Sequence, residues 1–287
     1  FHPESSPSLP VFFSAVLSIV CGSLDFPVRV GYIRPLTFTP GTCFQDMFEL
    51  LSIAMLTVLA AGVGTLSGFG TSTILVPALS LFLPLPQTLL VVGIIHAFGN
   101  LWKVLLFRSG IRWKILLGFG IPGIATSLWG ASLAVSTSQP VLARTLGVFL
   151  PAYGFFLLWK PKLKVPQTPL AAVAGGALGG FSAGIFGIGG AIRSLFLTLY
   201  DLPKTVYIFT GGAVGLLIDT TRLATYWQSG VKLEQHLLIG FALFIPASFL
   251  GAKLAQRLAA KIPQEKFRFV VAGFLLLAGI KLLLIPT

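Results

Sequence analysis

Charged side chains are scarce in this chain, and acidic ones are the scarcest. Only 10% of the 287 residues are charged, with 20 lysines and arginines against 8 aspartates and glutamates. Soluble domains carry about 25% charged residues, whereas here 55% of the residues are hydrophobic and the mean hydropathy is +0.92. The composition excludes an ordinary soluble domain and indicates a protein that lies in lipid.

Cysteine is nearly absent, which leaves little room for a metal or redox site. The two copies, Cys21 and Cys43, do not have the spacing of metal ligands. A disulfide between them would require an oxidising compartment, and two unpaired thiols are the alternative. Since no ATP-binding motif and no metal site is apparent either, no cofactor is expected.

A continuous basic face is also missing, despite a formal net charge of +12. Nucleic-acid binding needs a basic stripe or an aromatic-basic motif, and we therefore exclude it. The basic residues instead form short clusters between apolar segments, which is typical of the cytoplasmic loops of membrane proteins.

Apolar segments of helical length are present throughout the chain after residue 47. About 20 residues cross a hydrocarbon core of about 30 Å, so segments 71–83 and 190–200 are too short to span it. Residues 1–47 form an N-terminal segment in which 11–24 could be a partial or interfacial helix. The expected helices are 48–67, 71–83, 86–107, 113–136, 140–159, 169–186, 190–200, 203–227, 234–256 and 266–285.

The two halves of the chain resemble each other, mostly at an offset of 119 residues. "GFGTSTILVP" (68–77) aligns with "GIGGAIRSLF" (187–196), and "LPQT" (85–88) matches "LPKT" (202–205). Asn100 and Lys103 fall opposite Asp219 and Arg222. We therefore predict a duplication, with repeat 1 at 48–159, a basic linker at 160–168 and repeat 2 at 169–287.

The basic loops predict that the two repeats are inverted. Loop 108–114 and linker 160–168 are basic and should be cytoplasmic, whereas loop 136–140 is uncharged. In the second half the basic loop is 257–268, which places the C-terminus outside. We expect an all-α, polytopic protein with two inverted-topology repeats, each with a glycine-broken pair and three transmembrane helices. The broken pairs return to the side they entered, as re-entrant hairpins or as two full crossings.

The glycine breaks suggest where an anion could bind. A helix that begins inside the membrane has backbone N–H groups without partners and the positive end of its dipole. Broken helices of secondary transporters use these groups to bind anions, although the glycines could also serve only close helix packing. The predicted substrate-binding residues are Gly68, Gly70, Thr71, Ser72, Thr73, Gly187, Gly189, Gly190, Arg193 and Asn100.

Four polar residues on the apolar helices are predicted to act in coupling or gating: His96, Lys103, Asp219 and Arg222. Asp219 and Arg222 lie three positions apart, on one helix face, and could form an ion pair. Lys103 could extend to the interface, and His96 could relay protons because it titrates near neutral pH. If Arg193 does not contact the substrate, we expect it to form an ion pair with Asp219 or Asp201.

The duplicated glycine motif resembles that of the TauE/SafE family of sulfite exporters and related permeases. The first copy reads Gly68-Phe69-Gly70-Thr71-Ser72 and ends at Pro77, and the second is "GIGGA" at 187–191. The resemblance implies transport of a small organosulfur anion such as sulfite or a sulfonate. This chain departs from the family pattern at Thr71 and Ser72, which replace glycines, and at the charged Arg193.

These observations together predict a secondary transporter of the cell membrane that moves a small sulfur-containing anion by alternating access. Its partners would be that anion, the lipid bilayer and, for coupling, a proton. The alternatives are a channel or permease for another small anion, and an intramembrane enzyme with Ser67 and His96 as its dyad.

Overall fold

The computed structural model describes residues 40–108, 111–159, 168–258 and 264–284, and these residues form helices joined by short connections. Segment 11–24 and Cys21 lie outside the described residues. The elements are α2 (Pro40–Ser67), α3 (Ser72–Leu79), α4 (Leu85–Leu106), α5 (Trp113–Ser136), α6 (Gln139–Trp159), α7 (Pro169–Phe186), α8 (Gly190–Leu197), the 3-10 turn η1 (Thr198–Tyr200), α9 (Lys204–Gln228), α10 (Gln235–Leu258) and α11 (Gln264–Leu284).

The all-helical prediction is confirmed for this part of the chain, although several helix boundaries are shifted. Helices α5 and α7 have the predicted bounds, whereas α2 begins at Pro40 rather than at residue 48. Five stretches in the described residues are long and apolar enough to cross a membrane: Gln45–Ser67, Leu85–Leu106, Trp113–Ser136, Pro169–Phe186 and Gln235–Leu258.

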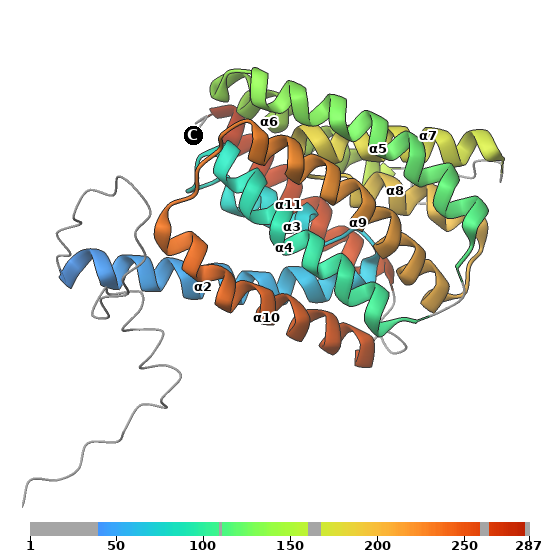
Figure 1. Cartoon of the computed structure of the whole chain (residues 1–287), viewed down its shortest axis with the longest axis horizontal. Coiled ribbons are helices and arrows are strands. Elements are labelled where there is room, and N and C mark those ends of the chain that lie inside the picture. The colour runs from blue at the N-terminus through green and yellow to red at the C-terminus, as the bar shows by residue number, and fades with distance from the viewer. Residues whose placement is uncertain (1–39, 109–110, 160–167, 259–263, 285–287) are drawn as a thin grey trace, which may run out of the picture.

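The helices pack in pairs that link the two halves of the chain. Helix α5 packs along α7, and α10 packs along α2, as Figure 1 shows for α2 and α10 along one edge of the molecule. Helix α4 packs against α9, and α6 against α11. Exchanging the first five helices for the last five reproduces this set of pairs, as expected if two copies of one unit face each other.

Close packing of α7 on α5 explains several of the glycines in α7. Gly176, Gly180 and Gly184 recur every fourth residue, and a Cβ atom on any of them would overlap backbone atoms of α5. Small residues at this spacing let membrane helices approach closely. The contacts progress in the same direction along both helices, from Gly118 beside Ala172 to Gly130 beside Gly184, so α5 and α7 are parallel.

Helices α7 and α8 form a hairpin whose turn is the second glycine motif. The side chain of Thr168 caps α7 by accepting a hydrogen bond from the Ala171 backbone N–H, and Pro169 follows in the first turn, where proline is favoured. The Tyr200 hydroxyl donates to the backbone carbonyl of Thr168, at 3.0 Å. The chain therefore returns after α8 to the end of the molecule at which α7 began.

The positions at which α4 and α9 begin correct the register of one sequence match. Pro84 and Pro203 are the N-cap residues of α4 and α9, so residues 83–84 correspond to 202–203 at an offset of 119. The match of "LPQT" with "LPKT" was therefore two residues out of register, because the sequence "LPLP" (83–86) contains the dipeptide twice. With this correction the same offset of 119 relates the two glycine breaks, the starts of α4 and α9, and the polar residues of these two helices.

Candidate functional site

The centre of the molecule contains a buried polar network between α4 and α9. The carboxylate of Asp219, which is 1% exposed, accepts a hydrogen bond of 2.7 Å from Asn100 and one of 2.9 Å from Arg222 Nε. His96 Nδ1 lies 2.9 Å from the same carboxylate. The predicted ion pair of Asp219 and Arg222 is therefore formed, and Asp219 is also shared by two residues of the other repeat.

Lys103 belongs to the same network but has no carboxylate of its own. Its Nζ donates to Oδ1 of Asn100 at 3.2 Å, and that amide in turn donates to Asp219. The side chain is buried, with 5% of its surface exposed. Lys103 does not extend to the surface of the protein as a lysine near a helix end can do, and its charge stays inside the helical packing.

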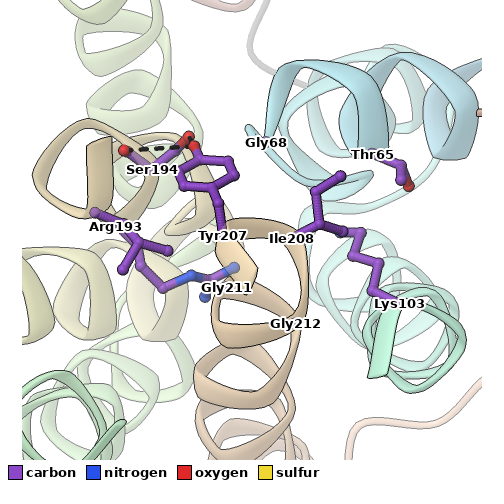
Figure 2. A pocket seen from close by; sticks show the side chains of 10 residues that line it. Thr65, Gly68, Lys103, Arg193, Ser194, Tyr207, Ile208, Gly211 and Gly212 are labelled. Carbon is purple, nitrogen blue, oxygen red and sulfur yellow. Dashed lines mark hydrogen bonds between the residues drawn. The ribbon is translucent and has the colours of Figure 1, made fainter. Parts of the chain in front are cut away.

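A cavity lies beside this network, on the side of Lys103. Its volume is about 10 Å³, which is room for about one water molecule. Figure 2 shows Lys103 on one side of it and Arg193, Ser194 and Tyr207 on the other. Its lining residues are Thr65, Gly68, Lys103, Arg193, Ser194, Leu197, Tyr207, Ile208, Gly211 and Gly212, so both halves of the chain contribute.

Arg193 is the second cation of this cavity. It lies on α8, is only 4% exposed, and has no carboxylate within ion-pairing distance in the part of the chain that the structure describes. The alternative of a pair with Asp219 or Asp201 is not formed, because the carboxylate of Asp219 pairs with Arg222 and His96 instead. Besides His96, the buried charged residues at or near the cavity are thus three cations and one carboxylate: Lys103, Arg193, Arg222 and Asp219.

The first glycine break brings a tight turn against His96. Gly68 and Gly70 have φ angles of 78° and 84°, which L-residues other than glycine rarely adopt. The Gly70 N–H donates to the Gly64 carbonyl at 3.1 Å, and a Cβ on Gly70 would lie 2.7 Å from His96 Nε2. That nitrogen is buried without a hydrogen-bond partner, as are the hydroxyls of Thr71 and Ser72.

The predicted substrate-binding residues do not all lie at the cavity. Gly68 and Arg193 line it, and Asn100 holds Lys103 beside it. Thr73 donates to the Phe69 carbonyl. The second break is closely packed: a Cβ on Gly189 would overlap α7, and one on Gly190 would overlap Phe69. Besides Asn100, seven of the ten predicted residues do not line the cavity: Gly70, Thr71, Ser72, Thr73, Gly187, Gly189 and Gly190. The binding roles of all ten remain predictions.

Several cavity residues had no distinguishing signal in the sequence. Thr65, Ser194, Tyr207, Gly211 and Gly212 belong to apolar helices in which a hydroxyl or a glycine is common. Only the offset between the repeats could have singled out Ser194, because its counterpart is the apolar Leu75. A polar residue that replaces an apolar one at a repeated position is a usable signal.

The Ser67 and His96 dyad of the enzyme alternative is not formed. The Ser67 hydroxyl donates to the Val63 carbonyl of its own helix at 2.8 Å. His96 hydrogen-bonds with Asp219 and Asn100 instead.

The apolar helices and the buried charged cavity define a multi-pass membrane protein with a polar interior, as membrane transporters have. Residues 53–282 match the family described as sulfite exporter TauE/SafE, and the chain therefore belongs to this family of membrane transporters, which are not enzymes. It is also 24% identical over 267 residues to "Probable membrane transporter protein MJ0441" of Methanocaldococcus jannaschii, an alignment that covers 83% of this chain and 98% of that protein.

Proposed function

We propose that this protein is a secondary transporter that binds a small sulfur-containing oxyanion between Lys103 and Arg193, in a state in which the cavity between them is wider than in this structure. The observation that carries the proposal is that these two buried cations line one cavity and have no carboxylate partner in the described part of the chain. Burying an unpaired charge costs several kcal/mol, so an arrangement of this kind favours an anionic ligand that moves in and out.

The chemistry of the lining suits an oxyanion. Arg193 offers a planar fork of N–H donors that matches the oxygens of a sulfite or sulfonate group. Lys103 supplies a second positive charge, and the hydroxyls of Thr65, Ser194 and Tyr207 can donate to further oxygens. Asn100 positions Lys103, while Asp219 compensates the charge of Arg222 outside the cavity lining.

Alternating access is supported by an inverted arrangement of the two repeats. Helix α5 of the first repeat runs parallel to α7 of the second, and α10 runs parallel to α2, since Leu50 meets Gly240 and Val58 meets Gly251. Helices α2 and α7 are the equivalent first helices of the two repeats. Each of them therefore packs along the fourth helix of the other repeat. Inverted repeats of this kind rock against each other around a shared site in secondary transporters.

The two ends of the molecule differ in the polarity of their equivalent positions. At the offset of 119, the counterparts of Arg193 and Ser194 are Ile74 and Leu75, and the counterpart of Ile208 is Leu89. Leu75 and Leu89 are buried in the hydrophobic core. The polar cavity therefore lies toward one end of the molecule, the end where Thr168 follows the basic linker. We propose that this end is cytoplasmic; the C-terminus then lies outside.

His96 is the residue that we propose for coupling. Its Nδ1 is held by Asp219, while Nε2 faces the first glycine break without a hydrogen-bond partner. A proton on Nε2 would place an imidazolium between the carboxylate and the break. Binding of a proton there would change the charge beside the anion site by one unit.

The test is uptake into proteoliposomes that contain the purified protein, with radiolabelled sulfite first and with sulfate and short sulfonates as competitors. We expect saturable uptake and accelerated counterflow from liposomes preloaded with unlabelled anion. Non-saturating flux without counterflow would instead indicate the channel, and no flux of any of these anions would contradict the proposed substrate class.

A further inference from the structure

Two side chains lie between the proposed anion cavity and a second, larger cavity near the end of the molecule. This outer cavity has a volume of about 260 Å³ and is lined by Leu66, Thr198, Asp201, Leu202, Lys204, Tyr207 and Ile208. Tyr207 and Ile208 are the two residues that line both cavities. The side chains of these two consecutive residues of α9 therefore lie between the two cavities.

The order of the residues along α9 gives the depth of each cavity. Lys204 at the start of the helix lines the outer cavity, and Gly211 and Gly212 line the inner one. At 1.5 Å per residue, Gly212 lies about 12 Å deeper than Lys204. Tyr207 stands between these two levels, so an anion that moves from the outer cavity to Lys103 and Arg193 must pass it.

The hydroxyl of Tyr207 joins three separate segments. It is hydrogen-bonded to Ser194 Oγ of α8, as the dashed line in Figure 2 shows, and it lies 3.5 Å from the Ser194 carbonyl oxygen. It also lies directly against Gly68, where a Cβ would overlap both Tyr207 and Ser194. The ring of Tyr207 thus spans from α9 of the second repeat to the glycine break of the first.

The opposite end of the molecule lacks this arrangement. The counterparts of Tyr207 and Ser194 are Thr88 and Leu75, and the Thr88 hydroxyl donates to the Leu83 carbonyl just before its own helix. Because Leu75 has no hydroxyl, no equivalent bond can form there. The Tyr207–Ser194 contact is therefore specific to the end at which the polar cavity lies.

We propose that Tyr207 and Ser194 form a latch that closes the anion cavity from the outer cavity. In the closed state the hydroxyls are bonded and the ring fills the passage; in the open state the bond is broken and the ring leaves Gly68. The latch controls access to the proposed binding site and so rests on that proposal, but its operation can be measured without any transported substrate.

The test is a double-mutant cycle on the accessibility of the inner cavity. In a background where Cys21 and Cys43 are replaced by serine, Thr65→Cys places a thiol in the cavity lining. Its rate of modification by an anionic methanethiosulfonate reagent is measured on the purified full-length protein. Since a neutral hydrogen bond shifts an equilibrium by about fivefold, Tyr207→Phe and Ser194→Ala should each raise the rate about fivefold.

The double variant Tyr207→Phe/Ser194→Ala should react no faster than either single variant, because both changes remove the same bond. Thr88→Val at the other end is the matched control and should leave the rate unchanged. Single variants that react at the parental rate, or a double variant whose rate is the product of the two effects, would overturn the latch. If the labelling rates follow the prediction but no anion is transported, the latch stands and the proposed function fails. If anion is transported but the labelling rates do not follow the prediction, only the latch is wrong.

Discussion

Asn100 of α4 donates a hydrogen bond of 2.7 Å to Asp219 of α9, and the two residues are 119 positions apart. This separation equals the offset between the repeats, so each residue binds its own counterpart. Such a contact forms only where two copies of a unit meet near their axis of symmetry. The side chains that meet there are nevertheless different, since an amide faces a carboxylate and Lys103 corresponds to Arg222. A cation therefore stands at the equivalent position of both halves, whereas the carboxylate is present in the second half alone.

The two buried arginines should respond in opposite ways to removal of their charge. Arg222→Met leaves the carboxylate of Asp219 without its guanidinium and should lower the free energy of unfolding by about 3–5 kcal/mol. Arg193→Met removes a buried cation that has no carboxylate partner in the described part of the chain, and should leave stability unchanged or raise it. Thermal unfolding in detergent without added anion compares the two variants directly.

Uptake measurements should show whether Arg193 contacts the anion. If Arg193 contacts the anion, Arg193→Met should reduce uptake by roughly 10- to 150-fold, the effect of losing about 1.5–3 kcal/mol from a hydrogen bond to a charged group. Arg193→Lys is the control that keeps the charge without the fork. A loss of stability in Arg193→Met equal to that of Arg222→Met would show that Arg193 is a structural residue.

The first glycine break should tolerate a side chain poorly, for two separable reasons. Gly70→Ala adds a Cβ 2.7 Å from His96 Nε2 at a φ angle of 84°. Gly230 has a φ angle of 75°, and an added Cβ would meet nothing within 4 Å, so Gly230→Ala reports the backbone strain alone, about 1–2 kcal/mol. We expect Gly70→Ala to cost more than Gly230→Ala in unfolding experiments. Gly273→Ala, with open space in a helix, should be neutral or stabilising.

Proton coupling can be separated from anion binding at His96. His96→Gln keeps a side chain that can donate to Asp219 but cannot carry a proton. We expect uptake driven by a pH gradient to be lost, while counterflow exchange of labelled sulfite at equal pH continues. Stimulation by the gradient that persists in this variant would assign coupling to another group.

The orientation of the repeats can be checked with single cysteines in the background without Cys21 and Cys43. An impermeant maleimide applied to intact cells should label Ser138→Cys and Ser229→Cys, which follow α5 and α9, but not Lys114→Cys or Lys162→Cys. The basic loops predict this pattern. Labelling of only one of the two serine positions would contradict the inverted arrangement.

The sequence predicted the helices of this fold well because apolar length and glycine breaks are local signals. The bounds of α5 and α7 and the Asp219–Arg222 pair followed from hydropathy and from a three-residue spacing on one helix. The meeting of Asn100 with Asp219 did not follow, because it depends on how α4 crosses α9. Tyr207 was missed for the same reason: a tyrosine near the start of an apolar helix acquires its place beside Gly68 only through tertiary packing.

The central claim is that an oxyanion binds between Lys103 and Arg193, and its most direct measurement is a density map of the protein with selenite, a heavier analogue of sulfite. The account predicts an anomalous scattering peak inside the cavity, in contact with both cations, that disappears in Arg193→Met. A peak elsewhere in a protein that still transports sulfite, or a peak that persists unchanged in Arg193→Met, would contradict it.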